Sequence, residues 1–348
     1  MNRASIEDVT PVADTFGRPL RSLRISVTDR CNLRCQYCMP EVDYSWLPRA
    51  NILSFEEIGA LVDVFLDAGV RKLRLTGGEP LLRRDLPALV RLLSSKPRVT
   101  EIALTTNGVL LASQAEALRD AGLHRITVSL DTLRPDRHLR LARHNGHDKV
   151  LDAIRVARDV FGSLKLDAVM IRGVNDDEMV ELLEYAKRAG AEIRFIEYMD
   201  VAGASSWSEE QVLSRREMLD RLAGRYGKVE PVEVTEWAPA DRFSLPDGTI
   251  FGIIGSTTEP FCRTCDRSRL TADGVWYRCL YAEAGTDLRT PLRNGVSREE
   301  LRATIEREWR ARDDRGAELR AQQKDRRAYV PLTSPEGDPH LQMHTRGG

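Results

Sequence analysis

Short β-forming segments alternate with helical periodicity over residues 23–197, and this alternation constrains the fold more than any other feature. The segment 54–68 carries the clearest helical signal, because Ser54 and Glu57 have capping-box spacing and apolar residues follow at helical intervals. The predicted strands cover residues 23–27, 72–75, 100–105, 124–130, 164–171 and 192–197. Strands separated by helices form βαβ units, so the sequence predicts a parallel sheet.

Unusual residues stand at the end of nearly every predicted strand. They are the first cysteines, Gly77-Gly78-Glu79-Pro80, Thr105-Thr106-Asn107-Gly108, Ser129-Leu130-Asp131 and Tyr198-Met199. A doubly wound sheet concentrates such residues at one switch point, whereas a barrel collects them around one rim. The pattern therefore predicts an incomplete (β/α)6 barrel of the TIM type.

The character of the chain changes after about Val201, where short strands and turns replace the alternation. We interpret this part as a smaller β-rich region, and the highly charged segment 297–312 as a solvent-facing helix. The first residues carry no motif that predicts a role. The predicted division is an N-terminal extension at 1–21, the partial barrel at 22–200, the C-terminal region at 201–330 and a tail at 331–348.

Six cysteines fall into two widely separated groups of three. Cys31, Cys35 and Cys38 have C-x3-C-x2-C spacing, and a C-x2-C-x13-C set lies in the C-terminal region. The second set is Cys262, Cys265 and Cys279. A saturated [4Fe–4S] cluster takes four thiolates, so a triad leaves one iron open to a substrate. Two triads suggest two such clusters.

Two simpler interpretations of the cysteines compete with this one. Sets of three do not pair into disulfides, and residues 1–10 lack an apolar signal segment, so a reducing cytoplasm is expected. Structural zinc is the stronger rival, because C-x2-C is a common zinc half-site. The spacing of the first triad is not that of a zinc ribbon, and zinc is the more serious alternative for the second.

The charge balance excludes some classes of partner. With 52 basic and 53 acidic residues the formal net charge is −1, which gives no overall field to attract nucleic acid or a membrane surface. No apolar run reaches the length of a membrane-spanning helix. An anionic substrate would have to be held by local basic residues.

Two motifs together give a family resemblance. The first triad with Tyr37 beside its last cysteine, followed by Thr-Gly-Gly-Glu-Pro, resembles the radical S-adenosylmethionine (SAM) enzymes. The second triad, the Arg267-Ser268-Arg269 run and the terminal Gly347-Gly348 narrow the resemblance to the GTP 3′,8-cyclases (MoaA) of molybdenum cofactor biosynthesis. The resemblance runs from about Leu23 to the last residue.

The resemblance implies two [4Fe–4S] clusters and a site for SAM. It implies that SAM is bound by Gly78, Ser129 and Met199, with a contribution from the backbone of Tyr37. Glycines at positions 77 and 78 would also allow the backbone to approach the methionine part of SAM closely.

The substrate is expected among basic residues on the strands. Arg24, Arg74 and Lys165 lie on three different predicted strands, where they could converge on one polyanion unless each faces outward or pairs with an acid. The resemblance implies that these three bind GTP, together with Thr105 and the run Arg267, Ser268 and Arg269. It assigns a catalytic role to Arg267, Arg269, Gly347 and Gly348, although Arg346 stands where relatives often have an apolar residue.

The implied reaction is radical cyclisation. A 5′-deoxyadenosyl radical would remove hydrogen from C3′ of GTP, giving (8S)-3′,8-cyclo-7,8-dihydroguanosine 5′-triphosphate. The implied partners are a low-potential electron donor, a second copy of the chain in a homodimer, and the cyclic pyranopterin monophosphate synthase that takes the product. The alternatives are a two-cluster radical enzyme that modifies a peptide and a non-catalytic iron–sulfur redox sensor.

Overall fold

The computed structural model describes residues 10–41, 43–201, 206–233, 238–323, 326–328 and 339–347. Its strands form one twelve-stranded sheet in the order β12-β11-β10-β1-β2-β3-β4-β5-β6-β9-β8-β7. The first six strands are β1 (Ser22–Ser26), β2 (Lys72–Thr76), β3 (Glu101–Thr106), β4 (Arg125–Ser129), β5 (Leu164–Met170) and β6 (Ala191–Glu197). The others are β7 (Glu230–Val232), β8 (Asp241–Ser244), β9 (Ile250–Ile254), β10 (Arg267–Leu270), β11 (Val275–Tyr277) and β12 (Thr286–Asp287).

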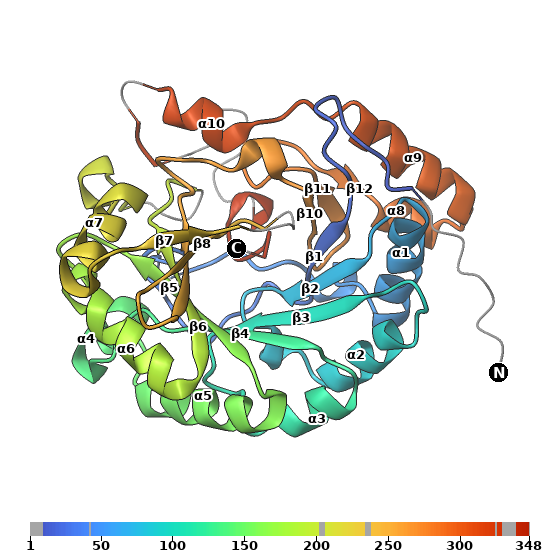
Figure 1. Ribbon diagram of the computed structural model, residues 1–348. Coiled ribbons are helices and arrows are strands. Elements are labelled where there is room, and N and C mark those ends of the chain that lie inside the picture. The colour runs from blue at the N-terminus through green and yellow to red at the C-terminus, as the bar shows by residue number, and fades with distance from the viewer. Residues whose placement is uncertain are drawn as a thin grey trace.

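The predicted partial barrel is confirmed, and the C-terminal region extends its sheet. β10 pairs in parallel with β1 and β9 pairs in parallel with β6, so both additions continue the row of β1 to β6. Antiparallel strands then flank the row at both ends. Figure 1 shows the strands curving around an interior that holds the C-terminus, with helices outside. The sheet thus crosses the predicted boundary at residue 200, and the division into domains stays a prediction.

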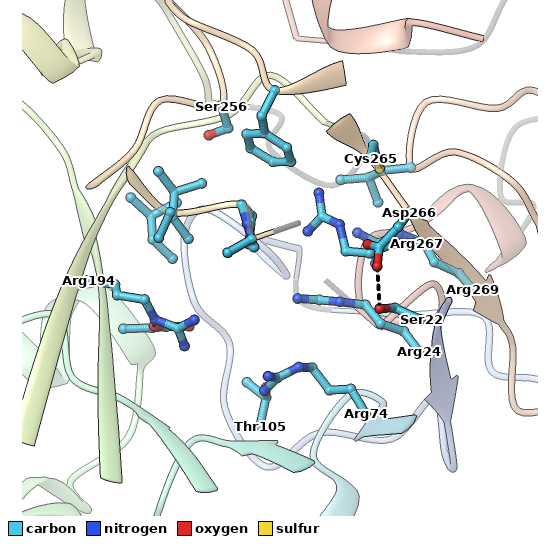
Figure 2. Close-up of a pocket in the computed structure, with 18 of the residues that line it drawn as sticks. Ser22, Arg24, Arg74, Thr105, Arg194, Ser256, Cys265, Asp266, Arg267 and Arg269 are labelled. Carbon is cyan, nitrogen blue, oxygen red and sulfur yellow. Dashed lines mark hydrogen bonds and ion pairs between the residues drawn. The ribbon is translucent and has the colours of Figure 1, made fainter. Parts of the chain in front are cut away.

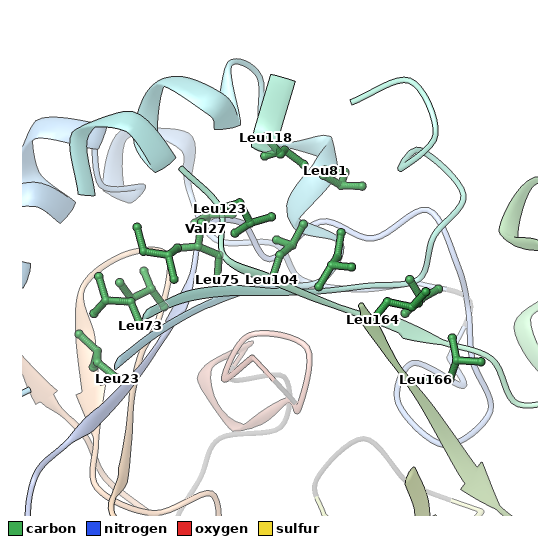
Figure 3. Close-up of a cluster of buried hydrophobic side chains, with 14 of the residues drawn as sticks. Leu23, Val27, Leu73, Leu75, Leu81, Leu104, Leu118, Leu123, Leu164 and Leu166 are labelled. Atoms are coloured by element: carbon green, nitrogen blue, oxygen red, sulfur yellow. The ribbon is translucent and has the colours of Figure 1, made fainter. Parts of the chain in front are cut away.

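Alternation along the strands separates an apolar outer face from a polar inner one. In β1, Ile25 is fully buried in the main hydrophobic cluster, whereas Arg24 beside it lines an internal cavity. Figure 3 shows the leucines of several strands, such as Leu75 and Leu104, gathered on one side of the sheet with helices above them. Side chains of a strand alternate between its faces, so the apolar core lies between the barrel and its helices.

The helices form that outer layer. They are α1 (Phe55–Asp67), α2 (Leu86–Ser94), α3 (Ala115–Asp120), α4 (Pro135–Ala142), α5 (His147–Phe161), α6 (Met179–Ala189), α7 (Arg215–Tyr226), α8 (Arg289–Arg293), α9 (Arg298–Arg310) and α10 (Gly316–Ala321). The predicted capping box of α1 is present, with the Ser54 side chain accepting from the Glu57 backbone. Within the described ranges, no helix has the length and apolar character needed to cross a membrane.

The charged helix predicted at 297–312 is present as α9 and exposes most of its charged residues, but the prediction missed an apolar stripe on its other face. Leu301, Ile305 and Trp309 recur at intervals of four residues and are buried in the main cluster. The Trp309 ring stacks on Trp276 of β11, with ring centroids 6.4 Å apart. The charged residues occupy the remaining faces, so α9 anchors the C-terminal strands to the barrel.

Replacing Leu75 with Ala should destabilise the barrel wall. Leu75 is fully buried on β2, and removing such a side chain leaves a cavity that costs about 2–5 kcal/mol. The free energy of unfolding in denaturant measures this loss. Leu82→Ala is the matched control, because Leu82 is 42% exposed and its truncation should change stability by less than about 0.5 kcal/mol. Equal effects of the two substitutions would contradict the proposed core.

Candidate active site

Two adjoining cavities occupy the inside of the barrel. The larger has a volume of about 660 Å³ and the smaller about 240 Å³. Side chains of both predicted sites line them, since the first cysteine triad faces the smaller cavity and the second faces the larger. Five residues line both cavities: Thr105, Asp167, Ile196, Met199 and Met343. The two triads therefore open toward one shared interior.

The first triad lies in the loop that follows β1. The backbone turns tightly there, since the amides of Cys38 and Met39 both donate to the carbonyl oxygen of Cys35. Burial raises the pKa of Cys31 to about 11 and that of Cys38 to about 12. The pKa of Cys35 also rises, mainly through burial and then through Asp131 and the other two thiols. All three cysteines line the smaller cavity.

The chemistry of both triads fits an iron–sulfur cluster. All six cysteines are free and partly buried, and thiolate sulfur is the ligand that such clusters use. No group of three or more His, Cys, Asp or Glu side chains among the described residues is placed to hold a single metal ion. In a cubane cluster each thiolate binds a different iron atom. The three sulfur atoms of a triad therefore need to surround a whole cluster and not a single ion.

Gly77 and Gly78 hold the loop after β2 against the loop after β1. The Gly78 amide donates to the Thr28 carbonyl at 2.8 Å, and a Cβ atom at Gly78 would lie 2.2 Å from the Arg30 carbonyl oxygen. A Cβ at Gly77 would lie 2.5 Å from the Thr28 oxygen. The close approach that requires glycine is therefore between two backbone segments, the loop after β1 and the loop after β2. Gly77 and Gly78 also line the smaller cavity.

Glu79 is a residue of the site whose role the sequence did not reveal. Its buried carboxylate accepts hydrogen bonds from Thr106 Oγ1 at 2.7 Å and from the Asn107 amide at 2.8 Å. Asn107 in turn donates to Asn32 Oδ1 at 2.8 Å, beside Cys31. Burial raises the pKa of Glu79 to about 7. The sequence places Glu79 in the Gly-Gly-Glu-Pro run, but only the fold shows that its hydrogen bonds connect the end of β3 to the loop of the first triad.

The other residues predicted to bind SAM surround the same smaller cavity. Ser129 lines it at the end of β4, and Met199 lies where the two cavities meet. The hydroxyl of Tyr37 donates to Asp131 Oδ2 at 2.7 Å, and the Val169 amide donates to the other carboxylate oxygen. The Tyr37 side chain is thus held by Asp131, and the contact of its backbone with SAM stays a prediction.

Basic side chains converge in the larger cavity (Figure 2). Strand register places Arg24 directly between Arg74 of β2 and Arg269 of β10. Burial lowers the pKa of Arg24 well below its usual range, and the neighbouring guanidinium groups of Arg269, Arg267 and Arg74 lower it further. Burial also lowers the pKa of Arg74 to about 10 and that of Arg269 to about 9. Such a cluster favours a polyanionic ligand.

Lys165 and Thr105 line the larger cavity too, but each has a protein partner. Lys165 Nζ lies 2.9 Å from Glu192 Oε1, so one predicted cation pairs with a nearby acid. Thr105 Oγ1 accepts from Arg74 Nη1 at 3.0 Å. Arg194, which the sequence did not single out, faces the same space and pairs with Asp167 at 2.7 Å.

The second triad lies beside the basic cluster. Cys262 and Cys265 enclose a short 3-10 turn before β10, and Cys279 follows β11. Burial raises the pKa of Cys265, but Arg267 and Arg312 outweigh burial and bring it down to about 7. Arg267 and Arg269 line the larger cavity. Ser268, between them on the strand, is buried and lies outside the linings of both cavities in the described chain.

The C-terminal tail enters the barrel, where Gly347 contacts the basic cluster. The carbonyl oxygen of Gly347 accepts from Arg24 at 3.0 Å and from Arg269 at 2.9 Å. Gly347 has φ +68°, and a Cβ atom there would lie 2.1 Å from Thr76 Oγ1. Arg346, the residue that departs from the family pattern, is buried. It stacks over the Tyr277 ring and donates to the Leu280 carbonyl, and these contacts hold it in place. Gly348 lies outside the described residues.

Comparison with known families agrees with this arrangement. Residues 25–186 match the model of the Radical SAM superfamily, and residues 191–318 match that of Molybdenum Cofactor Synthesis C. The first match ends at residue 186 and the second begins at residue 191, so the boundary falls between β5 and β6, which are paired strands of the continuous sheet.

Curated relatives cover nearly the whole chain. GTP 3′,8-cyclase 1 of Mycobacterium tuberculosis is 54% identical over 97% of this chain and 95% of its own length. The GTP 3′,8-cyclase of Aquifex aeolicus is 43% identical over 90% of this chain and 96% of its own length. Among solved structures, SuiB of Streptococcus suis bound to S-adenosylmethionine has a TM-score of 0.59 at 14% identity, over 88% of this chain and 68% of its own. That likeness supports the fold.

Gly78→Ala should separate the two loops that hold the first triad. The added methyl group would meet backbone atoms, which cannot move without shifting the Cys31 loop, at a cost of about 1–3 kcal/mol. Iron content after anaerobic reconstitution should fall by about half, since each triad would hold one cluster. Gly224→Ala is the control, because a Cβ at Gly224 in α7 meets nothing within 4 Å. Full iron loading of Gly78→Ala would show that the close approach is not required.

Proposed function

The chain belongs to the GTP 3′,8-cyclase family of the radical SAM superfamily, and we propose that it converts GTP to 3′,8-cyclo-7,8-dihydro-GTP as the first step of molybdenum cofactor biosynthesis. The observation that carries this proposal is the pair of adjoining cavities, each lined by one cysteine triad, with a cluster of guanidinium groups in the larger one.

The proposal assigns the two triads to two [4Fe–4S] clusters and the smaller cavity to SAM. Cys31, Cys35 and Cys38 would hold the first cluster, and the second triad would hold the other. When bound, the first cluster and SAM supply the 5′-deoxyadenosyl radical that abstracts hydrogen. The walls formed by Met199 and Tyr37 would separate that chemistry from bulk water.

The proposed substrate fits the charge of the larger cavity. Arg24, Arg74, Arg267 and Arg269 lie on three neighbouring strands, and their mutual repulsion is unfavourable until an anion arrives. A triphosphate offers several oxygens that accept charge-assisted hydrogen bonds from such groups. The nucleobase would then lie toward the second triad, which borders the same space.

The tail has a defined task in this account. Because Arg24 and Arg269 both donate to the Gly347 carbonyl, the tail fixes the direction of two guanidinium groups in the larger cavity. It also brings backbone close to Thr76, at the edge of the smaller cavity. The terminal residues thereby connect the two sites and would exclude water from the space between them.

The proposed cellular location, oligomeric state and partners follow mainly from membership of the family. We place the enzyme in the cytoplasm, where reducing conditions suit six free thiols. We further propose a homodimer, a low-potential electron donor and delivery of the product to cyclic pyranopterin monophosphate synthase.

Turnover tests the proposed reaction directly. Anaerobically reconstituted protein with a reductant, SAM and GTP should yield 5′-deoxyadenosine and a cyclised nucleotide in equal amounts, measured by liquid chromatography and mass spectrometry. A peptide-modifying enzyme would leave GTP unchanged under these conditions, and a redox sensor would leave SAM uncleaved. Either result would refute the proposal.

Arg74→Gln should weaken GTP binding without affecting the clusters. Arg74 lines the larger cavity, and its side-chain hydrogen bonds within the described part of the chain go to the neutral hydroxyls of Thr105 and Thr127, which leave its charge for the substrate. Loss of a charged hydrogen bond of about 1.5–3 kcal/mol corresponds to about a 10–100-fold rise in the Kd for GTP. Equilibrium dialysis measures the Kd, and iron content should stay unchanged.

The matched control for this substitution is Arg83→Gln. Arg83 contacts the Leu53 carbonyl and the Phe55 ring and lines neither cavity within the described residues. Its replacement should leave GTP affinity as it was. An unchanged Kd in Arg74→Gln would place the triphosphate elsewhere.

A further inference from the structure

The segment before β1, in which no motif predicts a role, forms a tight turn that contacts the loop of the second triad. Ala13 and Pro19 form an antiparallel bridge, and the Asp14 amide donates to the Arg18 carbonyl at 3.1 Å. Gly17 completes the turn with φ +74°, a conformation that favours glycine. The turn therefore presents the side chains of Asp14 and Arg18 in a fixed direction.

Arg18 reaches from this turn to the second cysteine loop, 244 positions along the chain. Its side chain is only 1% exposed. Nη1 donates to the carbonyl oxygens of Cys262 and Asp314, both at 2.9 Å, and Nε lies 2.5 Å from Asp14 Oδ2. A buried guanidinium is tolerated only when it is paired, so these bonds define its place.

Arg312, just after α9, makes the matching contact with the other cysteine of the loop. Its Nη1 donates to the Cys265 carbonyl at 2.9 Å, and the same atom lies 3.5 Å from Asp14 Oδ2. Its side chain is also 1% exposed, and Nε lies 3.2 Å from Asp314 Oδ1. Asp14 is thus the shared carboxylate between two buried arginines, and each arginine holds one cysteine carbonyl.

The remaining groups around these residues fix the pair in place. The Trp309 indole donates to the Arg18 carbonyl at 3.0 Å, and its ring lies under Arg312 at 4.4 Å. Thr15 Oγ1 donates to the Arg312 carbonyl at 2.8 Å. Arg267, which lines the larger cavity, is a second cation beside Arg312 that acts on Cys265. The N-terminal turn, α9 and the triad loop are therefore linked into one rigid unit.

We propose that Asp14, Arg18 and Arg312 are positioning residues for the second iron–sulfur site, holding the Cys262–Cys265 loop and setting the charge that a bound cluster meets. This inference rests on the proposed function, because it assumes that the second triad binds a cluster. Positive charge beside a cluster stabilises its reduced, more negative form and raises its reduction potential, and negative charge does the opposite. Substitutions of the arginines and of the aspartate should therefore shift the potential in opposite directions.

The test uses the full chain with Cys31→Ala, Cys35→Ala and Cys38→Ala, so that iron binds only at the second triad. This background should retain about four iron atoms per chain. Arg312→Gln and Arg18→Gln should move the midpoint potential to more negative values, and Asp14→Asn should move it to more positive values, in anaerobic titrations followed by electron paramagnetic resonance. Arg312→Lys, which keeps the charge, should restore the potential.

Arg172→Gln is the matched control. Arg172 also donates to backbone carbonyls, those of Glu210 and Val212, but on a different loop of the barrel, and its replacement should leave the potential unchanged. A purely structural role for the N-terminal turn predicts lower iron content with no sign reversal between the arginine and aspartate variants, and that result would overturn the inference.

The variant that lacks the first cysteine triad also distinguishes a failure of this inference from a failure of the proposed function. If it holds no iron at all, the second cluster does not exist and both proposals fail. If it holds iron while Arg18→Gln and Arg312→Gln keep both iron content and potential, only the role of the N-terminal turn is refuted.

Discussion

The parallel pairing of β1 with β10 is the interaction on which the site depends. It sets Arg24 opposite Arg269, although the two residues are far apart in sequence, and the register of β2 adds Arg74 to the same row. Residues in register on neighbouring parallel strands project on the same face, so one pairing turns three separate motifs into one cationic surface. It also brings Cys262 and Cys265, the two cysteines of the second triad that precede β10, into the barrel that holds the first triad.

The charge inside the barrel explains the other features of the interior. Three guanidinium groups crowd around Arg24, and burial lowers the pKa of Arg24, Arg74 and Arg269. Partial compensation comes from the protein itself: the tail offers the Gly347 carbonyl, and Asp167 and Glu192 pair with Arg194 and Lys165. The uncompensated remainder is what an anionic nucleotide would neutralise. The same arginines that destabilise the empty barrel through their mutual repulsion would therefore increase its affinity for the substrate.

Much of the architecture could be predicted from the sequence because it depends on local patterns. The six barrel strands lie within two residues of their predicted ends, and the capping box of α1 marks its start. Strand alternation could also have excluded Ser268 from the cavity, since Arg267 and Arg269 cannot share a face with the residue between them. In the same way, the four-residue spacing of Leu301, Ile305 and Trp309 could have predicted the buried face of α9. By contrast, the roles of Glu79, Asp14 and Arg18 come from contacts between distant segments, which no local pattern reveals.

The central claim is that both triads face one chamber in which SAM and GTP meet. A crystal structure of anaerobically reconstituted protein with both ligands tests it most directly. The account predicts SAM in the smaller cavity beside Gly78 and Met199, and the triphosphate among Arg24, Arg74 and Arg269 in the larger one. Ligands bound in separate compartments, or a nucleotide outside the basic row, would contradict it.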